Sequence, residues 1–275
     1  MEAHAEQEAA PREVCERPVF IIGSPRSGTS ALAWALAEHD AFWTSGETDF
    51  FFHLFGQGRL QEMWVACGGG TTTSWMAVNG VSRAEFAGAM GFGLNALLTR
   101  RSAGRRWIDQ SPTYTVMANE LAVLLPDALF VHIMRDGRNV VHSMVNTGFD
   151  ALWAQDFTEA CRTWAWFVEQ SVMFGEREPD RYLAVPHEFL LENPADCFAG
   201  IYDFLDVEDA EEPVEFARSR RINSSFQPDG SMNEKYLAPP QPWTTWTAEQ
   251  RKIFAAEAGR VFVEHGFGTE RDLAV

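Results

Sequence analysis

Short runs of apolar, mostly β-branched or aromatic residues predict the strands of this chain. The clearest are Val19–Ile22 and Ala128–Met134, and weaker ones cover 105–109 and 181–185. Each strand is followed by a polar turn and then by residues of helical character, such as the alanine- and leucine-rich run at 31–37. Strands that alternate with helices in this way indicate an α/β domain.

The turn after the first strand has the spacing of a phosphate-binding loop. Gly23 and Gly28 bound it, and a helix begins directly after it, so backbone N–H groups and a helix N-terminus would surround an anion. Thr29 occupies the position at which a nucleoside triphosphatase has its catalytic lysine, and Arg26 is the sole cation in the loop. The loop therefore predicts a phosphate cradle that does not hydrolyse ATP or GTP.

Two motifs resemble those of sulfotransferases that use 3′-phosphoadenosine 5′-phosphosulfate (PAPS). Pro25-Arg26-Ser27-Gly28-Thr29-Ser30 resembles the 5′-phosphosulfate loop of that family. Arg135, which follows the 128–134 strand, and Ser143 resemble the family's 3′-phosphate motif. An arginine suits that task because its planar fork binds two phosphate oxygens. The alternative for Arg135 is an ordinary strand-to-helix turn capped by Asp136.

The resemblance implies a fold, a reaction and further nucleotide contacts. It implies a three-layer, P-loop-like α/β fold with a central parallel sheet and helices on both faces. The implied reaction transfers a sulfonate from PAPS to an acceptor hydroxyl and releases 3′-phosphoadenosine 5′-phosphate (PAP), without a metal. In this scheme Ser27, Gly28, Thr29 and Ser30 hold the 5′-phosphate. His187 stands where the family has a tyrosine near the adenine, and Ser224 or Ser225 lies in a loop that closes over the nucleotide.

Glu47 is the candidate general base. Gly46-Glu47 resembles a Gly-Glu step that supplies the base in membrane-bound and tyrosine-directed members of the family. A carboxylate beside aromatic residues such as Phe50 has its charged form disfavoured, which raises its pKa toward a useful value. The segment could instead be an acidic turn before a buried aromatic stretch, and His53 is a second candidate base.

One position departs from the family pattern. Many members have Lys-Thr-Pro where this chain has Gln110-Ser111-Pro112, and that lysine can reach the transferred sulfonate. The change places more of the charge stabilisation on Arg26.

Several other segments are interpreted without the motifs. Residues 1–17 are expected to form a flexible tail and 18–275 a single domain. The glycine- and threonine-rich stretch 56–80 is read as a flexible loop, either an acceptor lid or a surface insertion. The aromatic residues of the helix at 156–174 are read as core.

Composition limits the partners. With 22 basic and 39 acidic residues the net charge is −17, which argues against nucleic acid and anionic membrane as partners. The four cysteines form no C-x-x-C pair and no apolar run is long enough to span a membrane, so we expect reduced thiols and a cytoplasmic enzyme. The abundant aromatic residues favour a small apolar or aromatic hydroxylated acceptor.

Two alternatives to a sulfotransferase are a P-loop nucleotide kinase or NTPase-like enzyme and a non-catalytic nucleotide-binding protein. The oligomeric state is left open.

Overall fold

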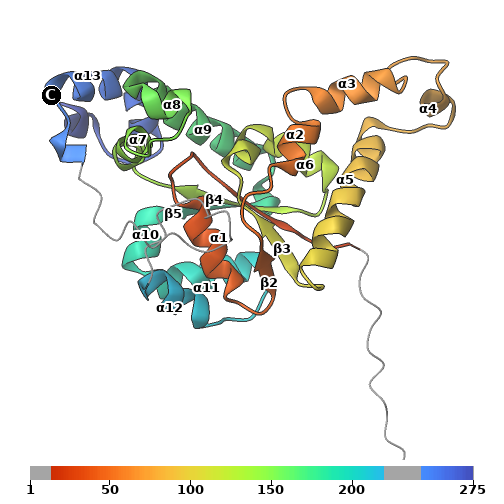
Figure 1. The fold of residues 1–275 in the computed structure, drawn as a ribbon, viewed down its shortest axis with the longest axis horizontal. Coiled ribbons are helices and arrows are strands. Elements are labelled where there is room, and N and C mark those ends of the chain that lie inside the picture. The colour runs from red at the N-terminus through yellow and green to blue at the C-terminus, as the bar shows by residue number, and fades with distance from the viewer. Residues whose placement is uncertain (1–13, 220–242, 275) are drawn as a thin grey trace, which may run out of the picture.

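A five-stranded parallel sheet forms the centre of the molecule (Figure 1). The computed structural model describes residues 14–219 and 243–274. The sheet order is β2-β3-β1-β4-β5, with every neighbouring pair parallel. The strands are β1 (Val19–Ile22), β2 (Phe42–Thr44), β3 (Arg106–Asp109), β4 (Leu129–Met134) and β5 (Tyr182–Pro186). Since all five run in the same direction, their carboxyl ends share one edge of the sheet.

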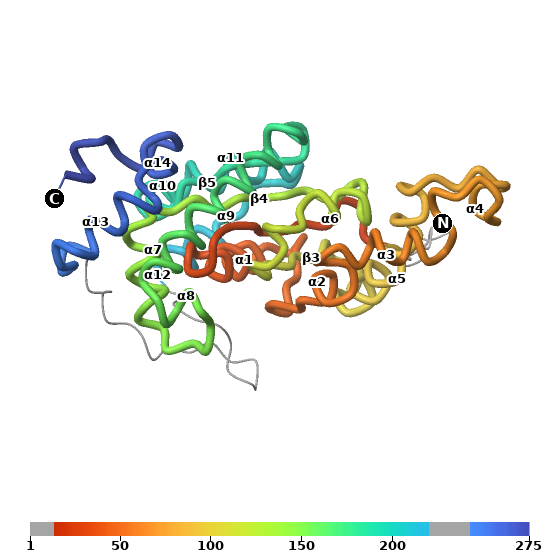
Figure 2. The backbone as a smooth tube through the Cα atoms, turned by 90° about the horizontal axis from the view of Figure 1, so that it is seen from above, coloured from red at the N-terminus to blue at the C-terminus, as the bar shows by residue number. Residues whose placement is uncertain are grey.

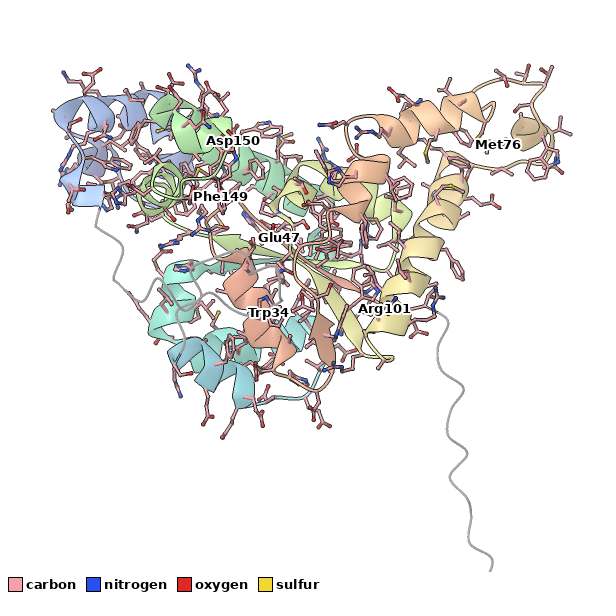
Figure 3. All side chains as sticks on the ribbon, in the orientation of Figure 1. Trp34, Glu47, Met76, Arg101, Phe149 and Asp150 are labelled. Atoms are coloured by element: carbon pink, nitrogen blue, oxygen red, sulfur yellow. The ribbon has the colours of Figure 1, made fainter. Side chains whose placement is uncertain are left out.

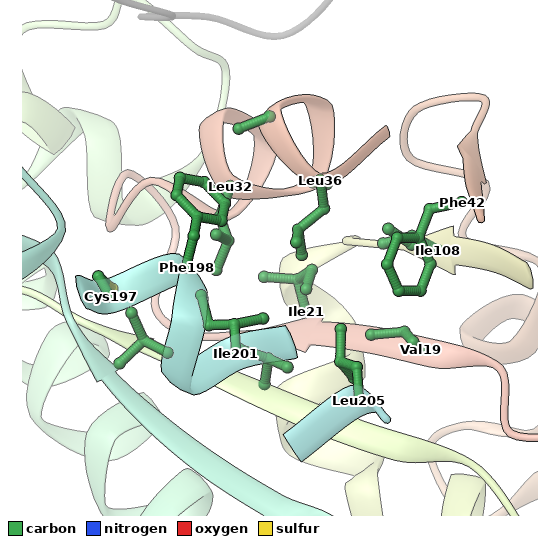
Figure 4. Close-up of a cluster of buried hydrophobic side chains, with 14 of the residues drawn as sticks. Val19, Ile21, Leu32, Leu36, Phe42, Ile108, Cys197, Phe198, Ile201 and Leu205 are labelled. Carbon is green, nitrogen blue, oxygen red and sulfur yellow. The ribbon is translucent and has the colours of Figure 1, made fainter. Parts of the chain in front are cut away.

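One face of the sheet is covered by helices α1 (Thr29–Ala37), α10 (His187–Glu192), α11 (Pro194–Leu205) and α12 (Glu212–Ser219). Alternate strand residues point to this face, so Val19 and Ile21 of β1 meet Leu32 and Leu36 of α1 (Figure 4). All four of these side chains are fully buried. Burying an aliphatic side chain of this size stabilises the fold by about 1.5–3 kcal/mol.

Phe20 is the centre of the opposite face. Its ring lies 5.4–5.6 Å, centroid to centroid, from the rings of Phe51, Trp107, Tyr114 and Phe130. Three of these pairs are edge-to-face and the fourth is stacked, the two arrangements that aromatic quadrupoles favour. The elements on this face are α2 (Phe50–Phe55), α5 (Arg83–Arg101), the 3-10 helix η1 (Pro112–Met117), α6 (Ala118–Leu124) and α9 (Phe157–Arg177).

A separate helical cluster lies beside the β5 edge of the sheet, at the left of Figures 1 and 2. Trp164 of α9 and Phe254 are at its core, with ring centroids 5.9 Å apart. Around them pack α7 (Gly137–Val145), α13 (Ala248–Glu257) and α14 (Gly259–Glu264), with α8 (Leu152–Gln155) next to α9. The short 3-10 helices are η2 (Pro179–Arg181), η4 (Trp243–Thr245) and η5 (Glu270–Leu273).

The glycine- and threonine-rich stretch 56–80 is not the flexible loop that its composition predicts. It contains α3 (Arg59–Ala66) and α4 (Trp75–Val78), which with α5 project from the body as an arm (Figures 1 and 2). Gly69 allows close packing here, because a Cβ at this position would lie 2.1 Å from the Trp64 ring. That ring in turn packs on Phe86 of α5, with centroids 5.6 Å apart.

The start of the described chain is also packed. Cys15 is buried, and its backbone N–H donates to Asn95 Oδ1 and to Thr99 Oγ1. Residues 14–17 therefore belong to the folded body, while the remainder of the expected tail, 1–13, lies outside the described residues. All four cysteines are free thiols. None of the helices in 14–219 and 243–274 is long and apolar enough to cross a membrane.

Candidate active site

The segments that follow all five strands line one cleft of about 400 Å³. Arg26 follows β1, Glu47 follows β2, Thr113 follows β3, Arg135 follows β4 and His187 follows β5. This is the carboxyl edge at which open α/β sheets bind ligands. In Figure 3, Glu47 lies above the sheet near the start of α1, and Phe149 lies to its left.

The loop after β1 has the close-packed geometry of a phosphate cradle. Gly28 has φ 109°, a left-handed conformation that favours glycine, and a Cβ there would lie 3.0 Å from the His187 ring. At Gly23 a Cβ would lie 2.9 Å from the Ile133 carbonyl oxygen. Thr115 holds the loop from the other side, because its hydroxyl bonds both the N–H and the carbonyl of Gly23, at 2.8 and 3.0 Å.

Arg26 and Arg135 are connected directly. Arg135 Nη1 donates to the Arg26 carbonyl oxygen at 3.0 Å, and Arg26 Nε donates to Ser143 Oγ at 3.2 Å. Arg26 also has φ 70°, which is strained for a residue with a Cβ and typical of functional sites. The two motifs predicted from the sequence therefore lie side by side, and Ser143 of the second motif contacts Arg26 of the first.

Two buried polar atoms of the predicted phosphate-binding residues have no partner in the described part of the protein. Within the described residues Ser27 Oγ and Arg135 Nε are buried and have no hydrogen-bond partner. Such groups are costly unless a ligand or water satisfies them. Burial lowers the pKa of Arg135, with nearby Glu188 opposing the shift. A hydroxyl donor and an arginine N–H held in this way suit phosphate oxygens.

Glu47 carries the electrostatics expected of a base. Crowding by protein atoms, followed by the charges of Asp49 and Asp109, raises its pKa to about 7. Arg26 and a hydrogen bond with Ser30 act in the opposite direction. Glu47 is also exposed to solvent at the mouth of the cleft, so water screens part of these effects. Its role as a base requires only that the pKa be shifted upward. A carboxyl that titrates near neutrality can accept a proton and release it again.

Aromatic side chains form the other wall of the cleft. Phe149, Trp153 and Phe167 line it, and the Phe149 and Trp153 rings meet edge to face with centroids 6.0 Å apart. The Arg26 guanidinium lies 5.9 Å from the Phe149 ring centroid, within cation–π range. The cleft thus combines a cationic phosphate side with an apolar side.

Most of the predicted site residues come together here. Cleft residues include Pro25, Arg26, Gly28, Thr29, Ser30, Glu47, Arg135 and His187. Burial, and then the charge of Arg135, lower the pKa of His187 to about 3, so its ring faces the cradle as a neutral group. Ser224 and Ser225 lie outside the described residues.

His53 and Gln110 are not brought to the cleft. His53 is an exposed residue of α2 and is absent from the cleft lining. Gln110 is fully buried, and its Oε1 accepts a hydrogen bond from Thr44 Oγ1 at 3.1 Å. The cations that the described residues contribute to the lining are therefore Arg26 and Arg135.

Sequence reasoning missed the aromatic wall. Phe167 was expected in the core with its helix, and it is buried but also lines the cleft. Trp164 is core as expected, whereas Trp166 is 48% exposed. Phe149 and Trp153 carry no motif, and only the packing of α8 against α7 and α9 brings them over the loop.

Comparison with known proteins identifies the class that this fold and site define. A model of the sulfotransferase family matches residues 18–211, and the chain belongs to this family. Among curated relatives, it is 23% identical over 196 residues to a putative protein-tyrosine sulfotransferase of Caenorhabditis briggsae, covering 70% of this chain and 66% of the relative. It is 26% identical over 198 residues to the protein-tyrosine sulfotransferase of Drosophila melanogaster, covering 69% and 38%.

Solved structures show the same fold. The sulfotransferase domain of the olefin synthase of Synechococcus PCC 7002 matches with a TM-score of 0.57 at 22% identity, over 93% of this chain and 98% of that one. Mouse sulfotransferase SULT7A1, solved with PAP, matches with a TM-score of 0.53 at 14% identity, over 96% and 88%. The expected parallel sheet with helices on both faces is confirmed, as is the assignment to the sulfotransferases.

Proposed function

We propose that this enzyme transfers a sulfonate from PAPS to an acceptor hydroxyl, with Glu47 as general base. The observation that carries the proposal is the convergence of Arg26, in the phosphate loop, and Glu47, a carboxyl with a raised pKa, on one cleft. A non-catalytic nucleotide-binding protein would have no need of such a carboxyl at the mouth of its cradle.

The nucleotide would be held by groups already in position. Ser27, Thr29 and Ser30 and the start of α1 would hold the 5′-phosphate, and Arg135 with Ser143 the 3′-phosphate. His187 closes the cradle at Gly28 and would face the nucleoside. PAPS supplies an activated sulfonate with PAP as the leaving group.

The chain's own groups perform two further tasks. Glu47 accepts the proton of the acceptor hydroxyl, which makes its oxygen a better nucleophile. Arg26 and the loop N–H groups stabilise negative charge as it grows on the leaving phosphate oxygen. Because Arg26 is already oriented by Ser143 and by the Arg135 contact to its backbone, little reorganisation is needed.

We propose a small apolar or aromatic acceptor, which the wall of Phe149, Trp153 and Phe167 supports. A tyrosine side chain of a peptide is the second candidate, favoured by the names of the relatives. Both present a hydroxyl on an apolar group. The chain covers only 66% and 38% of those two relatives, so their acceptors are not transferred directly.

A labelled-sulfonate assay tests the function and separates the two acceptors. The enzyme is incubated with labelled PAPS and with matched phenols, aliphatic alcohols and tyrosine-containing peptides, and products are identified by mass. We expect label in phenols or alcohols; label in peptides alone would make the acceptor a protein. A parallel assay with ATP and magnesium that yields phosphoryl transfer, and none from PAPS, would establish the kinase alternative instead.

A further inference from the structure

A buried carboxylate at the end of β3 lies outside the proposed reaction. Asp109 is 1% exposed and accepts four hydrogen bonds. Thr48 Oγ1 and Tyr114 OH donate to its Oδ2 at 2.5 and 3.1 Å, and the Ser111 hydroxyl and N–H donate to its Oδ1 at 3.2 and 3.4 Å. Among the described residues no basic side chain forms an ion pair with it.

A buried carboxylate without a counter-charge is unfavourable for folding. Hydrogen bonds offset only part of the cost of removing a charge from water. Positions that break a packing rule in this way are typical of functional sites. Asp109 therefore calls for an explanation in terms of what its hydrogen bonds hold.

Those bonds join the loop that carries the proposed base to the segment at the end of β3. Thr48 directly follows Glu47, and Asp109 is its acceptor. Ser111, bonded to the other oxygen of Asp109, accepts from the Asp49 N–H at 3.2 Å. Thr113 Oγ1 completes the link by donating to Asp49 Oδ1 at 2.7 Å. The loop that carries Glu47 is thus fixed to the end of β3 on its C-terminal side.

Asp49 has a strained backbone that this network maintains. Its φ is 54°, in the left-handed region that is uncommon for a residue with a Cβ and that Asp adopts more readily than most. Such a conformation persists when the surrounding contacts determine it, and here both its N–H and its carboxylate are held by residues after β3.

We propose that Asp109 is a positioning residue for the Glu47 base, fixing the loop through Thr48 and supplying a negative charge behind it. This rests on the proposed function of Glu47. Like charges disfavour ionisation of one another, so the charge of Asp109 keeps Glu47 ready to take a proton near neutral pH.

The groups around Glu47 shift its pKa in opposite directions. Burial is the largest cause and raises the pKa, as do the charges of Asp49 and Asp109, whereas Arg26 and the hydrogen bond with Ser30 lower it. Burial raises the pKa of Asp109 itself to about 6, and its four hydrogen bonds limit that rise.

The first test replaces the charge at nearly constant shape. In Asp109→Asn the carboxyl pKa of Glu47 is measured by ¹³C NMR, its resonance assigned by its loss in Glu47→Gln, and the pH profile of kcat/KM is recorded. We expect the Glu47 pKa and the acidic limb of the profile to fall together, by on the order of one unit, because a nearby like charge has been removed. Asp127→Asn, an exposed site at the opposite end of β4, removes the same charge and should leave both unchanged.

The second test removes the hydrogen bond that joins the loop to Asp109. Thr48→Val should lower kcat on the order of 10-fold, because the loop that carries Glu47 is loosened. Thr48→Ser restores the hydroxyl and should recover most of the activity. PAP affinity should change less than about 2-fold in both variants, since the phosphate cradle is untouched.

The outcomes separate this inference from the proposed function. A Glu47 pKa that does not move in folded Asp109→Asn overturns the electrostatic role, and full kcat in Thr48→Val overturns the positioning role, including when Asp109→Asn does not fold. If the Glu47 pKa falls as expected but Glu47→Gln retains turnover, the electrostatic effect of Asp109 on Glu47 holds, but the assignment of Glu47 as base fails and Asp109 has no positioning role in the reaction.

Discussion

Single side chains divide the work of the cleft, and Glu47 has the clearest task. Its carboxyl faces the cleft with a raised pKa, while His53 is exposed on α2 away from it. Glu47→Gln preserves shape but removes the proton acceptor, so we expect kcat to fall by roughly 10²–10⁴ with PAP affinity retained. Steady-state kinetics and calorimetric titration of PAP would measure the two effects.

His53→Ala is the matched control for this variant. It removes the rival base from an exposed position and should leave kcat unchanged. Normal turnover by Glu47→Gln together with an inactive His53→Ala would reverse the assignment.

The two arginines of the cleft should differ in kinetic signature. Arg135 faces the proposed 3′-phosphate side, and a contact that is equal in ground and transition states changes KM rather than kcat. Arg135→Ala should therefore raise the KM for PAPS with turnover largely recovered at saturation. Arg26→Ala should stay slow at any PAPS concentration, because the positive charge of Arg26 stabilises negative charge that develops on the leaving group in the transition state.

Arg83→Ala provides a control for loss of positive charge. Arg83 is an exposed residue at the start of α5, and its removal should alter neither constant. Because Arg135 also bonds the Arg26 carbonyl oxygen, circular dichroism and thermal unfolding must show that both cleft variants are folded. Identical signatures for Arg26→Ala and Arg135→Ala would contradict the division of roles.

At the scale of elements, the turn between β1 and α1 depends on one glycine. Gly28→Ala would place a Cβ in a left-handed conformation and 3.0 Å from the His187 ring. We expect a loss of about 1–2 kcal/mol in the free energy of unfolding, together with a higher KM for PAPS. Chemical denaturation and kinetics would measure these.

Gly70→Ala isolates the backbone part of this effect. Gly70 has φ 83°, but a Cβ at this position would point into open space, with no atom within 4 Å. The substitution should be destabilising to a similar degree yet leave the KM for PAPS unchanged. A raised KM in Gly70→Ala as well would show that the Gly28 effect is not local to the cradle.

The elements differ in how far the sequence reveals them. β1, β4 and their loops were predictable because a buried strand, a turn and a charged group follow one another locally, as at Ile22 and Arg26. β2 was not predicted, because its three residues Phe42–Thr44 are too few to show a period. The helices at 59–66 and 75–78 were hidden by neighbouring glycines, of which Gly69 packs closely on Trp64. The wall of Phe149 and Phe167 arises from tertiary packing, for which no local pattern exists.

For the whole molecule, a net charge of −17 surrounds a cleft that presents two arginines. Binding of a polyanion therefore depends on specific contacts rather than on long-range attraction. PAP should raise the melting temperature, since a ligand that binds the native state stabilises it. ATP lacks the 3′-phosphate that Arg135 and Ser143 are proposed to hold, and should raise it less at equal concentration. Equal shifts, measured by differential scanning fluorimetry, would contradict the assignment of the 3′-phosphate site.

The central position of β1 has a consequence for how the protein is made. The neighbours of β1 in the sheet are β3, which ends at Asp109, and β4, which ends at Met134. A ribosome that adds roughly 5–20 residues per second needs several seconds to pass from the first strand to the fourth. Until β3 has been made, the nascent Val19–Ile22 has neither of its strand partners, and the phosphate loop attached to it has no opposite wall. His187 also lines the cleft, so the complete cradle can form only after the chain has emerged from the ribosome beyond this residue, when about two thirds of the 275 residues have been made.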